Sequence, residues 1–181
     1  VKENSTWKIQ QTKDNAKCFN DKYIYSISYR PFDSKYIYYN ENFIERSRKE
    51  IAKHIIDKKQ ISLVISKQCV SDWRYIFISK TIGEFNLTGT AGRLGSGYYF
   101  PLYIYNDSSQ TSLEDTSERT PNLNLEIVNK IADKLGLYFS AEKPDYATQK
   151  EETNQFYPID LLDYIYAVLH SPKYRETYKE F

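Results

Sequence analysis

The first periodic pattern in the chain is an alternation of large apolar side chains with smaller or polar ones. The large members of the alternation are Tyr23, Tyr25, Ile27 and Tyr29. A period of two predicts a β-strand with one largely aromatic face. Pro31 is expected to end this strand, because proline has no amide hydrogen to donate to a sheet. Tyr36–Tyr39 is a candidate for a short second strand.

The period changes to that of a helix between Phe43 and Asp57. The apolar side of this helix would carry Ile44, Ile51, Ala52, Ile55 and Ile56. The opposite side would carry Glu45, Arg46, Lys49, Glu50 and Lys53. This pattern predicts an amphipathic helix with a basic outer face.

Three further strands are expected after this helix. They span Ile61–Gln68, Trp73–Lys80 and Tyr98–Tyr105, and a short polar turn joins the first two. Pro101 in the third strand predicts a sheet edge or a bulge. The glycine-rich segment Gly89–Gly97 lacks the Lys-Ser or Lys-Thr pair of a Walker loop and precedes a strand. It is therefore interpreted as a flexible hairpin loop, with close backbone approach to phosphates as the alternative.

The last third of the chain is predicted to be helical. A helix over Asn122–Leu135 should stop at Gly136, which suits a left-handed C-terminal position. Pro158 begins another helix, which is apolar most of the way around and is therefore predicted to be buried. Ser171 and Pro172 are expected to be the N-cap and first residue of a short final helix.

Together these elements predict an α+β fold. It would have a mixed, largely antiparallel sheet, a helix inserted between strands, and a C-terminal group of helices. The 181 residues fit one domain, assigned to 22–181. Residues 1–21 are polar and aperiodic, and they are interpreted as a linker to an upstream domain. The absence of methionine suggests a piece of a longer protein.

Composition argues against several classes of function. No stretch approaches the roughly 18 apolar residues of a membrane span. Cys18 and Cys69 are too few for a disulfide framework or a cysteine-built zinc site, and only His54 and His170 add further metal ligands. No nucleophile elbow or zinc-protease motif is present, so both histidines are interpreted as structural. We expect no catalytic residues, metal site or cofactor in this fragment.

Charge is distributed unevenly along the chain. Residues 1–80 contain 16 Lys and Arg against 9 Asp and Glu, a net charge of +7. Residues 81–181 contain 9 against 15, a net charge of −6. A basic half favours an anionic partner, although a solvated basic helix beside acidic loops is the simpler alternative. The cations of this half include Arg30, Lys35, Arg46, Arg48, Lys49, Lys53, Lys67 and Arg74.

Gln68 and Arg74 flank the turn between two predicted strands, and a turn of this kind can enter a DNA groove. Glutamine pairs with adenine and arginine with guanine in the major groove, while lysine and arginine contact phosphates. Trp73 is a candidate stacking residue, although a tryptophan at the start of a strand more often belongs to a core.

A series of short sequence motifs, in a fixed order along the chain, resembles one known family. The motifs are Tyr29–Asp33, Tyr36–Tyr39, Arg46–Glu50, Ser66–Gln68, Trp73–Ser79, Tyr99–Tyr105, Pro121–Asn124 and Asp163–Arg175. Together they resemble the C-terminal target recognition region of single-chain Type ISP restriction-modification enzymes and related Type IIG-like DNA methylases.

The resemblance implies a sequence-specific DNA recognition domain without catalysis of its own. Its parent would be a bacterial, cytoplasmic adenine-N6 DNA methyltransferase that uses S-adenosylmethionine and has restriction endonuclease activity. The expected partners are double-stranded DNA and the methyltransferase domain of the same chain. The alternative is an intramolecular docking domain that braces the methyltransferase or helicase through its late helices. The candidate DNA-binding residues are Arg30, Lys35, Arg46, Arg48, Lys67, Gln68, Arg74 and Arg93.

Overall fold

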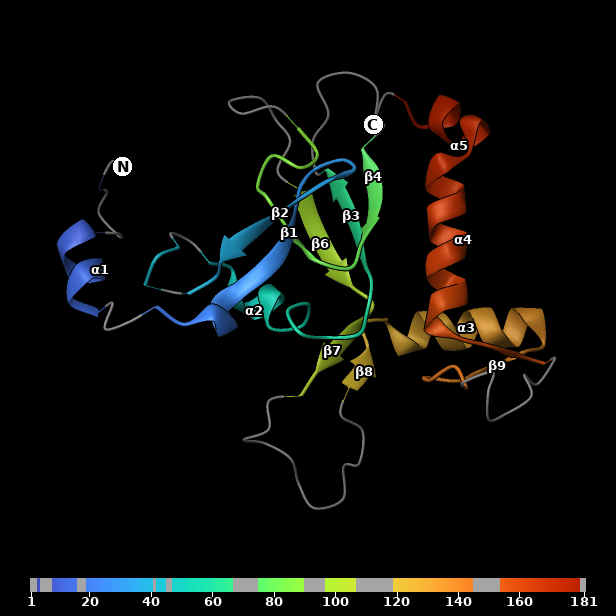
Figure 1. Ribbon diagram of the computed structural model, residues 1–181. Coiled ribbons are helices and arrows are strands. Elements are labelled where there is room, and N and C mark those ends of the chain that lie inside the picture. The colour runs from blue at the N-terminus through green and yellow to red at the C-terminus, as the bar shows by residue number, and fades with distance from the viewer. Residues whose placement is uncertain are drawn as a thin grey trace, which may run out of the picture.

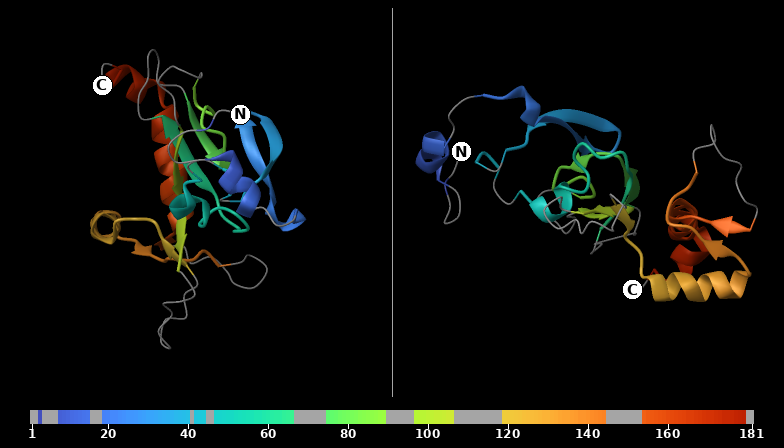
Figure 2. Two further views of the ribbon diagram at one scale, coloured as in Figure 1. Left: turned by 90° about the vertical axis from the view of Figure 1, so that its left-hand side faces the viewer. Right: turned by 90° about the horizontal axis from the view of Figure 1, so that it is seen from below.

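Three parts lie side by side in the computed structural model (Figure 1). A sheet built around β1 (Ile24–Arg30) and β2 (Asp33–Tyr38) lies on one side, a second sheet lies in the middle, and two longer helices lie on the other side. The view from below shows the same order of the three parts (Figure 2, right). The structure describes residues 3, 8–15, 19–40, 42–44, 47–66, 75–89, 97–106, 119–144 and 154–179.

The middle sheet consists of β3 (Ser62–Ser66) between β4 (Ile76–Ser79) and β6 (Gly97–Pro101). Both outer strands are antiparallel to β3. Because side chains alternate across a strand, Ser62, Val64 and Ser66 share one face, and all three are buried. Leu63 lies on the opposite face, where it packs against a cluster formed by Leu102, Tyr103 and Leu162.

The buried face of the middle sheet lies against the first sheet, which has the order β2–β1–β5. β1 (Ile24–Arg30) and β2 (Asp33–Tyr38) form an antiparallel hairpin, and β5 (Ile82–Gly83) pairs with β1 in parallel. The Ser28 and Ser79 hydroxyls are 3.2 Å apart and connect the two sheets. A Cβ atom added at Gly83 would overlap the phenol group of Tyr99, so this close approach requires glycine.

The strand predicted over Tyr98–Tyr105 is divided in the structure. β6 ends at Pro101, and β7 (Tyr103–Tyr105) pairs instead with β8 (Arg119–Pro121) in a separate antiparallel sheet. The break lies at Leu102, whose amide donates to the carbonyl of Ile61. Pro101 is therefore on an outer strand, as its missing amide hydrogen predicted.

Two longer helices and a small parallel pair of strands form the C-terminal part. The helices are α3 (Leu125–Leu135) and α4 (Pro158–His170), and the strands are β9 (Tyr138–Phe139) and β10 (Gln155–Phe156). Val128, Ala132 and Phe156 form the core of this part, against which Leu161 of α4 packs. Leu162, the next residue, packs toward the middle sheet, so α4 joins the two clusters.

Local capping rules explain where these helices begin and end. The Asn124 side chain accepts the amide hydrogen of Ile127, and Gly136 ends α3 with a φ of 65°. The Ser171 hydroxyl accepts the amide hydrogen of Tyr174 at the start of α5 (Pro172–Thr177). The predictions for Gly136, Pro158, Ser171 and Pro172 are confirmed.

The helix predicted from Phe43 to Asp57 is wrong in length. The described α-helix, α2, spans only Lys49–Ala52, and turns follow it. Arg48 and Asp57 have φ angles of 52° and 55°, and a continuous right-handed helix does not permit such angles. Ala52 and Ile55 are buried as the apolar pattern predicted, but a turn rather than a longer helix brings them inside.

One other expectation also needs correction. Helix α4 is not buried all around, since the side chain of Tyr164 is 69% exposed and Pro158 and Leu162 are its buried residues. Its outward side is not covered by any element of the described chain. Within residues 1–21 the structure has α1 (Ile9–Asn15), and a 3-10 turn, η1 (Asp21–Tyr23), begins at Asp21. The role of 1–21 as a linker stays a prediction.

The α+β fold class is confirmed, with mostly small antiparallel sheets. None of the described helices has both the length and the apolar composition that a membrane span requires.

Candidate nucleic-acid interface

Several of the candidate DNA-binding residues belong to segments that join the middle sheet at one end. Ser66 at the end of β3 is in register with Gly97 at the start of β6, and Ile65 is in register with Ile76 at the start of β4. The chain at 67–74 therefore leaves and re-enters the sheet at this end, and the chain at 90–96 re-enters there. Lys67, Gln68, Arg74 and Arg93 belong to these two stretches and lie outside the described residues, as does Trp73.

The apex of the β1–β2 hairpin lies at the same end of the molecule, near the top of Figure 1. It carries the described candidates Arg30 and Lys35. The Arg30 guanidinium carbon is 4.2 Å from the centre of the Tyr29 ring, and the Lys35 ammonium is 3.8 Å from the same centre. Two cations are thus held against one aromatic ring by cation–π contacts.

Arg30 is also fixed by an ion pair across two strands. Its Nη1 lies 2.6 Å from Oε2 of Glu84, just after β5. The same carboxylate accepts hydrogen bonds from the amide and the side chain of Asn86. Arg30 and Asp33 are backbone partners across the turn, but the guanidinium pairs with Glu84.

Arg48 lies elsewhere. It is exposed and precedes α2. The α2 region packs beside β7, because the His54 Nδ1 atom accepts the amide hydrogen of Tyr105 and Gln60 Oε1 accepts that of Tyr103. β7 lies beyond the Pro101 end of β6, so Arg48 is not part of the hairpin-apex group. Arg46 lies outside the described residues.

The two histidines occupy positions with clear structural contacts. His54 is buried and bonded to the backbone of β7, as described above. The His170 ring packs at a tilt against Tyr166 of the same helix, and its Nδ1 lies 3.1 Å from Nη2 of Arg175. Within the part of the chain that the structure describes, no group of three or more His, Cys, Asp and Glu side chains could hold a metal ion.

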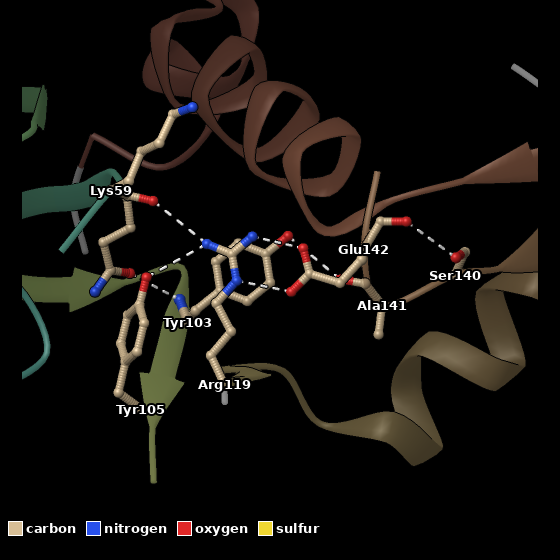
Figure 3. Close-up of polar contacts among 8 residues, drawn as sticks. Lys59, Tyr103, Tyr105, Arg119, Ser140, Ala141 and Glu142 are labelled. Atoms are coloured by element: carbon tan, nitrogen blue, oxygen red, sulfur yellow. Dashed lines mark hydrogen bonds and ion pairs between the residues drawn. The ribbon is translucent and has the colours of Figure 1, made fainter. Parts of the chain in front are cut away.

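Sequence reasoning missed a polar cluster centred on Arg119 (Figure 3). Its Nε and Nη2 atoms bind both carboxylate oxygens of Glu142, at 2.7 and 2.5 Å. Its Nη1 donates to the carbonyl of Lys59 and to the hydroxyl of Tyr105. The guanidinium carbon is 3.9 Å from the centre of the Tyr103 ring.

The Arg119 cluster connects parts of the chain that are distant in sequence. Lys59 precedes β3, Tyr103 and Tyr105 belong to β7, and Glu142 follows β9. The Tyr103 hydroxyl adds a hydrogen bond to the Ala141 carbonyl. The bidentate bond to Glu142 raises the pKa of Arg119, and burial together with Glu142 raises the pKa of Tyr103. No local sequence motif predicts this cluster, because its members are far apart in the sequence, with 83 positions from Lys59 to Glu142.

The family of the chain is shown by comparison with known proteins. The profile of Type ISP C-terminal specificity domains matches residues 1–181. The chain therefore belongs to this family, the part of Type ISP restriction-modification enzymes that selects the DNA target. The prediction of a DNA target recognition domain is confirmed at this level. No curated protein matches the sequence significantly.

Solved structures share the fold. The Type ISP enzyme LlaBIII, solved bound to DNA, aligns with a TM-score of 0.62 and 20% identity, over 96% of this chain and 10% of that one. The DrdV–DNA complex gives 0.60 and 18%, over 88% and 13%. A nuclease-deletion mutant of LlaGI in complex with a DNA substrate mimic gives 0.53 and 23%, over 89% and 11%. The chain thus spans about a tenth of the length of these enzymes.

Proposed function

We propose that this domain contacts its DNA target with the end of the molecule formed by the hairpin apex and the β3–β4–β6 sheet end. The observation that carries the proposal is the strand register. It brings the attachment points of 67–74 and 90–96 to the end where the hairpin presents Arg30 and Lys35. Six of the eight candidate residues thus belong to segments that emerge at one end, although they are spread from position 30 to 93.

The chemistry of this end suits a DNA groove. A two-stranded ribbon fits the major groove, and the β1–β2 hairpin is such a ribbon with an exposed apex. Lys35, held on the Tyr29 ring, would contact a phosphate and set the register of the domain on the duplex. Gln68 and Arg74 would supply base-edge contacts, since amide and guanidinium groups pair bidentately with adenine and guanine.

The parent enzyme would be larger than this chain. We propose that it is a bacterial, cytoplasmic enzyme whose adenine-N6 methyltransferase domain uses S-adenosylmethionine and whose nuclease cleaves DNA. In that enzyme this domain would select the sequence and contribute no catalytic group, metal or cofactor.

The test is a salt titration of DNA binding by fluorescence anisotropy. Lys35→Gln should weaken binding to all duplexes and reduce the slope of log affinity against log salt by about 1. The matched control is Lys130→Gln, since Lys130 is an exposed lysine of α3 on the far side of the middle sheet. Equal slopes for both variants and the unaltered protein would show that the hairpin does not contact phosphate.

A second candidate function, docking within the parent enzyme, has one observation in its favour. Large apolar side chains are exposed on α3, β9 and α4, namely Leu125, Ile127, Leu135, Tyr138, Tyr164 and Ile165. In the full-length protein, Ile127→Ser with Tyr164→Ser should lower the melting temperature if this surface is covered. The same pair of changes should leave the melting temperature of the isolated domain nearly unchanged, because both side chains are exposed there.

A further inference from the structure

The apex of the β1–β2 hairpin presents an aromatic side chain that the domain itself does not use. The Phe32 side chain has a relative exposure of 104%, so it is as open to solvent as in an extended peptide. All residues from Pro31 to Tyr36 are exposed, and Tyr36 is 81% exposed. A large apolar ring held entirely in water gives the isolated fold no stabilisation.

The backbone at Phe32 is also unusual. Pro31 and Phe32 form the two-residue connection between Arg30 and Asp33, and Phe32 has a φ of 64°. A β-turn with proline second and a left-handed residue third normally carries glycine or asparagine in that place. A bulky residue there is a conformational outlier, and outliers of this kind concentrate at functional sites. Phe32 is thus placed at a strained position without any compensating contact inside the domain.

We propose that Phe32 inserts against the bases of the DNA target, stacking on a base or wedging into a base step when the hairpin enters the groove. This inference rests on the proposed function and adds to it a stacking residue that charge and hydrogen-bonding patterns do not reveal. Proteins that deform DNA use protruding apolar side chains, phenylalanine included, to unstack a step. Stacking on an aromatic ring tolerates any base, because each base has a π face.

The surroundings of Phe32 fit nucleic acid better than a protein pocket. Lys35 lies three residues away and is held on Tyr29, so a cation is in place to meet a phosphate beside the inserted ring. Arg30 is held on the other side of the turn by Glu84 and Tyr29, which stiffens the base of the apex. Pro31 removes one backbone degree of freedom. An apex with an apolar tip and Lys35 beside it can thus insert a ring between bases and contact a phosphate at the same time.

The experiment uses the full-length protein and a duplex that this protein selects from a random-sequence pool. Permanganate oxidises unstacked thymines, so its reactivity reports each unstacked base step of the duplex that contains a thymine. Phe32→Ser should abolish at least one reactive thymine that the unaltered protein produces and lower the affinity roughly tenfold. Phe32→Leu should retain part of the reactivity, because leucine is also a wedge residue. Phe19→Ser is the matched control, since Phe19 is 73% exposed and lies against Tyr38 at the opposite end of the hairpin from the apex.

A protein pocket elsewhere in the parent enzyme is the competing occupant. In that case Phe32→Ser would lower the melting temperature of the full-length protein without DNA and leave the permanganate pattern unchanged, which would overturn the inference. The proposal expects no loss of melting temperature without DNA. Unchanged reactivity together with normal, Lys35-dependent affinity would overturn the Phe32 inference alone. Failure of the protein to bind any duplex would overturn the proposed function as well.

Discussion

The two arginine clusters of this domain are built from the same parts and have different consequences. Arg30 and Arg119 each pair with a glutamate and each lie over a tyrosine ring. The Arg30 pair is monodentate. The two pairs are exposed to a similar extent, with side-chain values of 40% and 28% for Arg30 and Glu84 and 28% and 50% for Arg119 and Glu142. The Arg119 pair is bidentate, with two further hydrogen bonds from the same guanidinium.

The difference lies in what each cluster connects. Arg30 joins β1 to Glu84 and steadies a hairpin whose apex is exposed. Arg119 joins β8 to the segments before β3 and after β9, and therefore holds the middle of the molecule to its C-terminal part. On sequence grounds Arg30 is a candidate for DNA contact because it lies in the basic half, whereas nothing in the local sequence singles out Arg119 in the acidic half. The comparison shows that bonding geometry, rather than local charge density, separates a scaffold arginine from a surface one.

The largest expected effect is that of Arg119→Ala. This change removes the bidentate bond and leaves the Glu142 carboxylate without its cation, which should lower the free energy of unfolding by about 2 kcal/mol. Arg119→Lys should recover little of this loss, because an ammonium group cannot make the forked contact. Urea denaturation measures both changes. A loss below that of Arg30→Ala would show that the Arg119 cluster is not the stronger of the two.

The next prediction compares two tyrosines, Tyr103 of the Arg119 cluster and Tyr99 of β6. The Tyr103 hydroxyl donates to the Ala141 carbonyl, whereas the Tyr99 hydroxyl is buried without a hydrogen-bond partner among the described residues. At neutral pH, Tyr103→Phe should therefore lower the free energy of unfolding by about 1 kcal/mol, and Tyr99→Phe should be nearly neutral. Equal losses would contradict the assigned bonding.

The same pair of tyrosines predicts a dependence on alkaline pH. Burial, and then Glu84, raises the pKa of Tyr99 well above its usual value of 10.0. The folded state therefore favours the neutral phenol, so this contribution is complete below pH 10 and is lost as the pH rises further. The unaltered protein should lose about 1.4 kcal/mol more per pH unit above 10 than Tyr99→Phe does. Unfolding curves at pH 8 to 11 measure the difference, and parallel curves would refute it.

A smaller effect is expected at the apex beside Arg30. Phe32→Gly should raise the free energy of unfolding by roughly 1 kcal/mol, because glycine adopts the observed φ of 64° without strain. Ser34→Gly in β2 is the control, and it should lower the free energy of unfolding, by about 0.5 kcal/mol, since its backbone is that of an ordinary strand. Chemical denaturation of both variants gives the comparison. Destabilisation by Phe32→Gly would mean that the ring contributes to the fold.

The smallest effect on stability is expected for Arg30→Ala. A partly exposed, monodentate ion pair contributes only about 0.5 kcal/mol. If the hairpin is the DNA-contacting element, this variant should nevertheless weaken DNA binding more than Arg119→Ala does. Parallel denaturation and anisotropy measurements on the two variants separate the roles. If both variants are folded and Arg119→Ala binds DNA more weakly than Arg30→Ala, then Arg119 rather than Arg30 contributes to DNA binding.

The elements that the sequence predicted well follow from rules that act within a few residues. Pro31 ends β1, Gly136 ends α3, and Ser171 with Pro172 begins α5, because each needs only its own backbone geometry and near neighbours. The alternation at Tyr23–Tyr29 likewise identified β1 to within one residue at each end. Local charge also selected Arg30 and Lys35, and the structure places both at the hairpin. As DNA contacts, all eight candidate residues stay predictions.

The sequence by itself determined the strand and helix ends that depend on proline, glycine, serine and side-chain period. Only the tertiary structure decided the parallel pairing of β5 with β1, the division of Tyr98–Tyr105 at Leu102, and the shortening of α2 to Lys49–Ala52. It also decided that Arg30 forms its ion pair with Glu84 and that Arg119 forms its ion pair with Glu142. The physical reason is that these contacts join residues tens of positions apart. Local sequence does not distinguish between the alternative partners, so the packing of the whole chain decides which of them pair.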